Sequence, residues 1–157
     1  MVRSVAESRF TLDTNLLVYS ADRDEGEKNQ VAAQILLRAP SLDCWLTLQS
    51  LSEFYAATTR KGIMQPVEAA AQVSDWLILF PTASASADAV RTALADAVAG
   101  RASYWDALLV ATAAEAGCTL ILSEDLADGS RLGGVAIHNP FDPAGGLTPR
   151  ASRLLSL

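Results

Sequence analysis

The sequence predicts an α/β domain in which helices cover both faces of a mainly parallel sheet, a three-layer α/β/α sandwich. Short apolar runs typical of buried strands alternate with longer stretches in which apolar residues recur at helical spacing. The chain has 157 residues, the size of one ordinary domain. Half of the residues are apolar and 19% are charged, so the chain can bury a substantial core. We therefore expect a single domain over residues 1–157, with its core at about 10–141 and a C-terminal tail at 142–157.

The first part of the chain predicts a strand at residues 10–12, followed by helical turns over 15–20. A helix is predicted over 27–38, where apolar residues recur on one helical face. It stops before Pro40, because a proline ring cannot continue a helix. A second strand is predicted at 44–47.

The alternation continues through the middle of the chain. An apolar helical face from Leu51 to Thr58 directly follows the second strand. Pro66 occupies the first turn of the next helix, which ends near the Phe80–Pro81 pair. A short strand or loop is expected over 79–82.

The second half predicts two further helices and two further strands. An alanine-rich helix spans 86–99, with Gly100 where a C-terminal cap belongs, and another helix begins at Ser103. Residues 119–123 give the strongest strand signal, an uninterrupted apolar run typical of a central parallel strand. A last strand is predicted at 135–137, and the tail offers only three leucines near its end as anchors.

Composition and charge exclude several classes of protein. A formal net charge of −6 argues against a general basic face for nucleic acid. Cys44 and Cys118 lie far apart in apolar runs and are predicted to be reduced core residues. A single histidine, His138, argues against structural zinc and is expected to have a structural role. The sequence shows no apolar signal core and no run of roughly 18 apolar residues that could span a membrane. We therefore expect a soluble cytoplasmic protein.

Four acidic residues stand near the ends of the predicted strands: Asp13, Glu53, Asp106 and Asp125. In an open α/β sheet, sites form beyond the carboxyl ends of the strands, so all four can face one edge. Each also has a structural interpretation. Glu53 and Asp106 have the spacing of capping-box residues after Ser50 and Ser103. Asp13 and Asp125 can be N-caps or Asx-turn residues.

Taken together, four carboxylates at one sheet edge would repel one another unless a cation lay between them. Carboxylate oxygens without histidine or thiolate ligands suit Mg²⁺ or Mn²⁺ and not zinc. Such ions activate water and hold phosphoryl oxygens, as in metal-dependent nucleases and phosphatases. The sequence has no glycine-rich GxxxxGK[ST] loop, which argues against a P-loop nucleotide hydrolase.

The segments that carry these acids resemble the motifs of the PIN-domain ribonucleases and, within that family, the VapC-type toxins of bacterial toxin–antitoxin systems. The similar segments, in the family's order, are 12–19 (LDTNLLVY), 51–54 (LSEF), 103–108 (SYWDAL) and 122–126 (LSEDL). Residues 138–141 (HNPF) resemble the usual close of the domain. The resemblance spans residues 10–141, and the combination of four motifs in this order is specific.

The resemblance implies that Asp13, Glu53, Asp106 and Asp125 form a catalytic acidic quartet that binds one or two Mg²⁺ or Mn²⁺ ions. A metal-activated water would attack an RNA phosphodiester, leaving 5′-phosphate and 3′-hydroxyl ends. Asp13 and Asp106 are implied as ligands, whereas Glu53 and Asp125 either act through water or take the proton of the nucleophile. Thr14, Asn15 and Ser123 would support the ligands. The family also implies a homodimer and a cognate antitoxin that blocks the acidic groove.

Basic and aromatic residues near the motifs have two interpretations each. Arg60, Lys61 and Arg101 can steer the RNA backbone, or they are solvated cations at helix ends. Tyr104 and Trp105 can stack on a base, but one of them is expected to belong to the core.

Two other functions remain compatible with the sequence. A non-catalytic interaction module would use the acids only as helix caps and would bind its partner without metal dependence. Another α/β metal-dependent phosphohydrolase, such as a phosphatase with an aspartyl nucleophile, would use Asp13 for attack. Such phosphatases have a second aspartate two residues later, where this chain has Asn15. We rank the nuclease above both.

Overall fold

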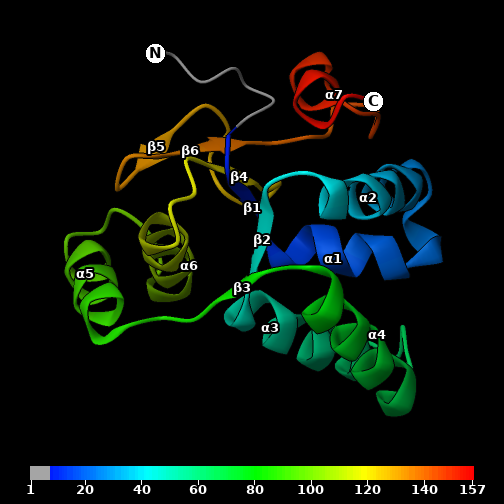
Figure 1. Cartoon of the computed structure of the whole chain (residues 1–157), viewed down its shortest axis with the longest axis horizontal. Coiled ribbons are helices and arrows are strands. Elements are labelled where there is room, and N and C mark those ends of the chain that lie inside the picture. Colours follow the sequence, from blue (N-terminus) through cyan, green and yellow to red (C-terminus); the bar gives the residue numbers. More distant parts are fainter. Residues whose placement is uncertain (1–7) are drawn as a thin grey trace.

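The computed structural model describes residues 8–157 and contains a six-stranded sheet of order β3-β2-β1-β4-β6-β5 (Figure 1). The strands are β1 (Phe10–Leu12), β2 (Cys44–Thr47), β3 (Thr82–Ala83), β4 (Leu120–Leu122), β5 (Arg131–Leu132) and β6 (Val135–His138). The pairs from β3 to β6 are parallel, and β5 pairs antiparallel with β6. In the centre, Phe10 lies opposite Cys44 on one side and Leu120 on the other. This mainly parallel sheet confirms the predicted fold class.

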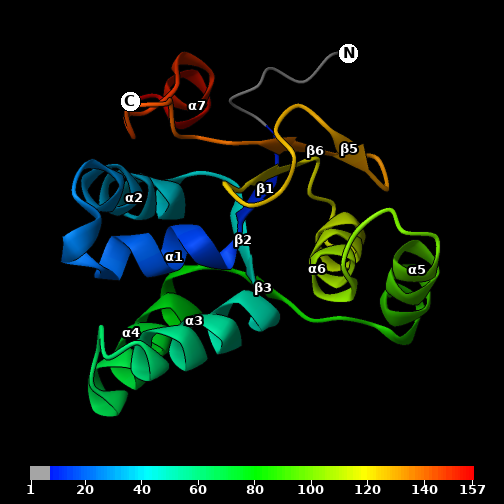
Figure 2. The same cartoon turned by 180° about the vertical axis from the view of Figure 1, so that it is seen from behind.

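Helices cover both faces of the sheet, as Figure 1 shows and as Figure 2 shows from behind. The helices are α1 (Thr14–Ala21), α2 (Glu27–Arg38), α3 (Leu48–Arg60), α4 (Pro66–Leu79), α5 (Ala87–Val98), α6 (Tyr104–Glu115) and α7 (Pro149–Leu155). Helices α1 to α4 lie on one side of the sheet, and α5 and α6 lie on the other. Two 3-10 turns, Arg23–Glu25 and Ala39–Ser41, flank α2. These layers form the predicted sandwich.

The hydrophobic core lies on both faces of the sheet. Leu120 and Leu122 of β4 belong to the large core with residues of α1 to α4, whereas Ile121 belongs to a smaller core with α6. Successive side chains of a strand point to opposite faces, so burial on both faces explains why β4 is continuously apolar. Just beyond the end of β1, the backbone N–H of Asp13 donates a hydrogen bond to the carbonyl of Leu122 in β4 at 2.9 Å. The carboxyl ends of β1 and β4 therefore lie side by side.

Helix caps fix the backbone around two of the acids. Asp13 is the N-cap of α1, as one interpretation predicted, and its side chain accepts a hydrogen bond from the N–H of Thr14. Ser103 caps α6, and its hydroxyl accepts from the N–H of Asp106. Both acids are thereby held at the start of a helix, beside the ends of the central strands.

The predicted capping box at Ser50 is wrong. Helix α3 begins one turn earlier, with Thr47 as its N-cap, and the Thr47 hydroxyl accepts from the N–H of Ser50. Thr47 is buried at the end of β2, so it can cap the helix without an intervening loop. Glu53 therefore lies well inside the helix and has no capping role.

The C-terminal segment contains a helix that the sequence analysis did not predict. Helix α7 packs Leu154 and Leu155 into the large core, whereas Leu157 is half exposed. Thr148 caps α7 and also hydrogen-bonds His138 of β6 at 2.8 Å. Arg38 of α2 donates from Nε to the carbonyl of Leu155 at 2.8 Å, so the segment is attached to both the sheet and α2.

Two further findings concern composition. Cys44 and Cys118 are buried, free cysteines, as predicted for core residues. Among residues 8–157, no helix is both long and apolar enough to cross a lipid bilayer.

Candidate active site

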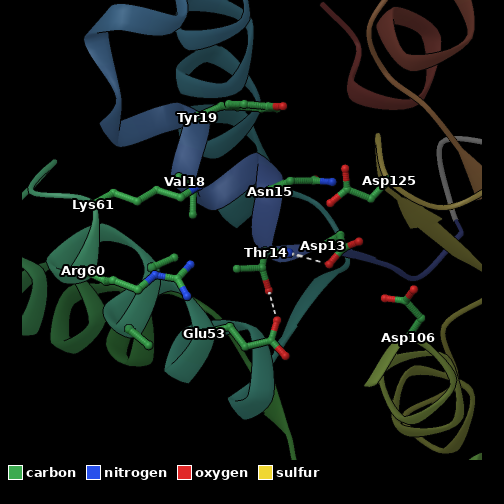
Figure 3. A pocket seen from close by; sticks show the side chains of 12 residues that line it. Asp13, Thr14, Asn15, Val18, Tyr19, Glu53, Arg60, Lys61, Asp106 and Asp125 are labelled. Carbon is green, nitrogen blue, oxygen red and sulfur yellow. Dashed lines mark hydrogen bonds between the residues drawn. The ribbon is translucent and has the colours of Figure 1, made fainter. Parts of the chain in front are cut away.

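One cleft of about 510 Å³ is lined by all four of the acids that the sequence singled out (Figure 3). Asp13 directly follows β1, and Asp125 lies in the loop after β4. Glu53 comes from α3, which follows β2, and Asp106 comes from the first turn of α6. The other lining residues are Thr14, Asn15, Val18, Tyr19, Ala56, Ala57, Arg60 and Lys61. The cleft thus lies at the carboxyl edge of the sheet, where sites of this fold class form.

Asp13 is the most enclosed of the four acids, with 7% of its surface exposed. One carboxylate oxygen accepts from the N–H of Thr14 at 2.7 Å, and the other accepts from the hydroxyl of Ser123 at 2.7 Å. Burial, reinforced by the charges of Asp106 and Asp125, raises the pKa of Asp13 to about 6, although the two hydrogen bonds oppose this rise. The fold therefore holds this carboxylate in a fixed direction but leaves its charge poorly compensated.

Glu53 is oriented by two neighbours. Its Oε2 accepts from the hydroxyl of Thr14 at 2.8 Å, and its Oε1 accepts from the amide of Gln49 at 2.9 Å. The same amide nitrogen of Gln49 donates to the backbone carbonyl of Trp105 at 3.0 Å. Gln49 therefore links α3 to the start of α6, beside Asp106. Gln49 was not among the residues predicted from the sequence, although its position one helical turn before Glu53 was a usable signal.

Asp106 and Asp125 are less constrained. Asp106 is partly exposed and Asp125 is exposed, and within residues 8–157 neither carboxylate has a hydrogen-bond donor or an ion-pair partner. The side-chain amide of Asn15 extends toward Asp125 in Figure 3. Both polar atoms of that amide are buried and have no hydrogen-bond partner in the described part of the chain. A buried amide normally has a partner, so Asn15 is available to a group bound in the cleft.

The loop after β4 directs its two acidic residues to different places. Glu124 is not among the residues that line the cleft; it accepts a hydrogen bond from the phenol of Tyr19 at 2.7 Å and pairs with Lys28 at 2.9 Å. Burial opposes ionisation of Glu124, but the hydrogen bonds from Tyr19 and Lys28 and the charge of Lys28 outweigh it and lower its pKa. Asp125, the next residue, lines the cleft. The role of Glu124 could not be predicted from the sequence, because no local spacing relates it to residues more than ninety positions earlier.

His138 lies outside the residues that line the cleft. Its Nε2 faces the hydroxyl of Thr148 at 2.8 Å, and its Nδ1 faces Asp128 at 3.2 Å. Burial, and then the charge of Arg150, lower the pKa of His138 despite the nearby Asp128, so the imidazole is neutral at pH 7. This bonding fits the structural role expected for it.

The basic and aromatic residues considered as RNA contacts lie in different environments. Arg60 and Lys61 line the cleft, whereas Arg101 is paired with Asp96 at 2.7 Å. Trp105 is 61% exposed, and Tyr104 packs partly against the small core of α5 and α6. Of the two aromatic residues, Tyr104 is therefore the one that contributes to the core, and Trp105 is free to contact a ligand.

The cleft has the donor chemistry of a hard divalent cation. In the described residues, no three acidic, histidine or cysteine side chains stand close enough together to hold an ion as they are placed. The cleft nevertheless offers carboxylate oxygens without thiolate or imidazole, the ligands that Mg²⁺ and Mn²⁺ prefer. The raised pKa of Asp13 marks a buried negative charge that a cation would stabilise. Asp13, Glu53, Asp106 and Asp125 are the residues that can hold one.

The fold of this chain is shared with known proteins. A family model described as PIN domain matches residues 10–127. The sarcin-ricin loop cleaving toxin VapC20 of Mycobacterium tuberculosis has a similar structure, with a TM-score of 0.61 and 15% identity over 74% of this chain and 89% of that chain. DNA-bound VapBC of Salmonella typhimurium gives a TM-score of 0.60 and 16% identity over 83% of this chain and 97% of that chain.

A toxin–antitoxin complex of Klebsiella pneumoniae gives a TM-score of 0.58 and 21% identity, covering 80% of this chain and 94% of that chain. No curated protein sequence matches the chain with significance. At these low identities, the structural likeness shows the fold alone.

Proposed function

The chain belongs to the PIN-domain family, and we propose that it is a divalent-metal-dependent endoribonuclease, the toxin of a toxin–antitoxin pair. One observation carries this proposal: carboxylates from four separate parts of the fold line a single cleft. Helix capping does not require such a convergence, because a cap acts on its own helix alone. Metal-assisted hydrolysis of a phosphodiester accounts for all four acids together.

The proposed catalytic and metal-binding residues are Asp13, Glu53, Asp106 and Asp125. Bound Mg²⁺ or Mn²⁺ would supply positive charge against a phosphate oxygen and would lower the pKa of an attacking water. Asp13 faces the cleft with its direction fixed by Ser123 and Thr14, which suits a ligand that must not rotate away. Asp106 stands on α6, on the far side of the cleft from Glu53 and α3.

Glu53 and Asp125 differ in how firmly the fold holds them. Glu53 is oriented by Thr14 and Gln49, so it is suited to accept a proton from the attacking water. Asp125 is exposed and can turn toward a cation from its loop. Attack of water on phosphorus would leave 5′-phosphate and 3′-hydroxyl ends on the RNA.

The solved relatives support the substrate class and the partner. One is a sarcin-ricin loop cleaving toxin, and another is a toxin–antitoxin complex. We accordingly propose RNA as the substrate and a cognate antitoxin as the partner that controls the cleft. A homodimer and a cytoplasmic location complete the proposal.

A phosphatase that uses Asp13 as its nucleophile is disfavoured by the geometry of Asp13. Both of its oxygens already accept hydrogen bonds, and only 7% of the residue is exposed. Each oxygen keeps a second lone pair that can bind a cation, but the two hydrogen bonds make the carboxylate a weaker nucleophile for a covalent bond to phosphorus.

The decisive experiment is incubation of the purified protein with labelled total RNA in the presence of Mg²⁺, Mn²⁺ or EDTA. We expect cleavage at a small number of sites with either metal, and none with EDTA. Asp106→Asn should lower the cleavage rate by about 100-fold or more, because metal-assisted catalysis is worth several kcal/mol. End-labelling of the products would identify the terminal groups.

The matched control is Asp88→Asn, which removes the same charge from an exposed position on α5 that is paired with Arg91. It should cleave like the parent protein. Absence of cleavage in metal-loaded, antitoxin-free protein across varied RNAs would reject the nuclease and favour a non-catalytic interaction module. Equal activity of Asp106→Asn and the parent would show that the site is misplaced.

A further inference from the structure

We propose that Arg60 and Lys61 form a phosphate-binding subsite that holds the RNA strand on one side of the acidic cleft. This inference rests on the proposed function and deepens it, because it assigns a strand-binding role to residues outside the acidic quartet. Three features support it: both cations line the cleft, neither makes an ion pair within residues 8–157, and hydrogen bonds order the helix end that carries them.

The two cations belong to the same helix as Glu53. Arg60 ends α3 and Lys61 is its C-cap, and both line the cleft. Glu53 and Arg60 are seven residues apart, about two helical turns, so they share one face of α3. In Figure 3, the side chains of Arg60 and Lys61 extend into the cleft from the side opposite Asp106 and Asp125. The positive groups therefore flank the acids instead of lying among them.

Neither cation is neutralised by a neighbouring acid. Four other cations of the chain, Arg9, Lys28, Arg91 and Arg101, lie within 3.2 Å of a carboxylate oxygen. Within residues 8–157, Arg60 and Lys61 make no ion pair, although they share a cleft with four acids. A cation beside an acidic site that does not pair with it keeps its full charge for an anionic ligand.

The helix end that carries the cations is well ordered by hydrogen bonds. The N–H of Ile63 donates to Thr58 at 2.9 Å, and the N–H of Lys61 donates to Ala57 at 3.0 Å. Gly62 closes the helix at φ +69°, a conformation that glycine adopts without strain. The favourable position of cations at a helix C-terminus explains why Arg and Lys occur here. It does not explain why both side chains extend into the cleft.

The negative charge of an RNA strand gives a reason for two cations to extend into the cleft. A divalent ion among the acids can neutralise the phosphate that is cut, but neighbouring phosphates of the strand still meet a protein of net charge −6. Arg101 does not line the cleft and is paired with Asp96. Beyond Lys61, an adjoining hollow is lined by the acids Asp22, Asp24 and Glu68 and by the cations Arg23 and Lys61, so its carboxylates outnumber its cations. The subsite is therefore short and holds one or two phosphates.

The test measures RNA binding separately from cleavage. Fluorescein-labelled single-stranded RNA is titrated in Mg²⁺ with the Asp106→Asn protein, with and without Arg60→Gln or Lys61→Gln, at several salt concentrations. For a single strand, each phosphate contact contributes about 0.7 to the slope of log affinity against log salt. We expect each substitution to reduce that slope by about 0.7. Between 50 and 200 mM salt, the affinity of each variant should then fall about 2.6-fold less than that of its parent.

Three controls make the result specific. Arg91→Gln removes the same charge from an exposed ion pair on α5, away from the cleft, and should leave the slope unchanged. Arg60→Lys and Lys61→Arg keep the charge and should keep the slope. In protein with an intact acidic quartet, Arg60→Gln should raise KM for RNA and leave kcat largely unchanged, because the subsite binds substrate and transition state alike.

Several outcomes would overturn the inference. An unchanged slope in both glutamine variants would reject the subsite, as would an equal change in Arg91→Gln. Weakened antitoxin binding with normal RNA binding would assign the two cations to the protein partner instead. The proposed function fails in a different way: a parent protein that binds RNA through these residues but never cuts it would reject the nuclease and leave the subsite standing.

Discussion

Asp13 combines two properties that conflict in a folded protein, since it is buried and yet must be ionised to bind a cation. Removal from water penalises the carboxylate, and the charges of Asp106 and Asp125 add to the penalty. The hydrogen bonds from Thr14 and Ser123 offset only part of it. Metal-free protein therefore carries a local electrostatic strain at this residue, which a bound cation would relieve.

This strain predicts how Asp13 affects stability at different pH values. The pKa in the folded state is about 6, above the ordinary value of 3.8, so the folded state binds the proton more tightly than the unfolded state. The contribution of the protonated Asp13 to the free energy of unfolding is complete below pH 4 and is lost as the pH rises through 6. One pKa unit corresponds to 1.36 kcal/mol, so the difference between 3.8 and about 6 amounts to a loss of about 3 kcal/mol.

Asp13→Asn should therefore be more stable than the parent by up to about 3 kcal/mol at pH 7.5 in EDTA, and the difference should vanish near pH 4. Asparagine is as good an N-cap as aspartate, so α1 should not be weakened. Urea denaturation at both pH values measures the difference. A variant that is less stable than the parent at pH 7.5 would contradict this electrostatic account.

At the residue scale, the acids could be predicted from the sequence and their supports only in part. Asp13 directly follows β1 and Asp125 lies in the loop after β4, and a strand end defines where the next side chains can lie. Ser123 was expected to support the ligands, and its hydroxyl does bind Asp13. Gln49 was missed although it lies one helical turn before Glu53, whereas the contacts of Gln49 with Trp105 and of Glu124 with Lys28 are formed by tertiary packing alone.

At the element scale, long amphipathic helices were predicted best. The predicted bounds of 27–38 coincide with α2, because its apolar face and Pro40 are both local signals. The two-residue strand β5 and the seven-residue helix α7 were not predicted. Elements this short show no clear periodicity, and an isolated short helix is only marginally stable in water. Helix α7 depends on burial of its leucines, which the sequence alone does not reveal.

This dependence predicts that α7 contributes to the stability of the whole domain. Leu154 is 2% exposed within the large core, so Leu154→Ala should lower the free energy of unfolding by about 2–5 kcal/mol. Leu157 is 51% exposed, so Leu157→Ala should cost less than about 1 kcal/mol. Guanidinium chloride denaturation of both variants tests this. Equal, small effects would show that the segment is not part of the cooperative unit.

At the scale of the whole molecule, the sheet gathers negative charge at one edge of an already acidic protein. The four acids lie far apart along the chain, and only the parallel arrangement of the strands brings them to one cleft. Two bound divalent cations would reduce the net charge from −6 to about −2 and reverse the local potential where phosphate must bind. Metal binding and folding should therefore be coupled.

The coupling predicts that divalent metal raises the thermal stability of the folded protein. A ligand at 100 times its Kd adds about 2.7 kcal/mol to the free energy of unfolding. For a chain of this size, that corresponds to an increase in Tm of roughly 5–11 °C. Differential scanning calorimetry with Mn²⁺ or Mg²⁺ against EDTA measures it without any RNA. The increase should be smaller at pH 5 than at pH 7.5, because protonated Asp13 binds a cation poorly.

The acidic quartet accounts for this coupling only if the effect is specific to the cleft. Asp13→Asn and Asp106→Asn should lose most of the metal-dependent increase in Tm, because each removes a proposed ligand. Asp88→Asn removes an exposed acid on α5, away from the cleft, and should keep the whole increase. If all three variants respond to metal like the parent, the stabilising ion binds elsewhere on the acidic surface. The convergence of the four carboxylates would then need another explanation.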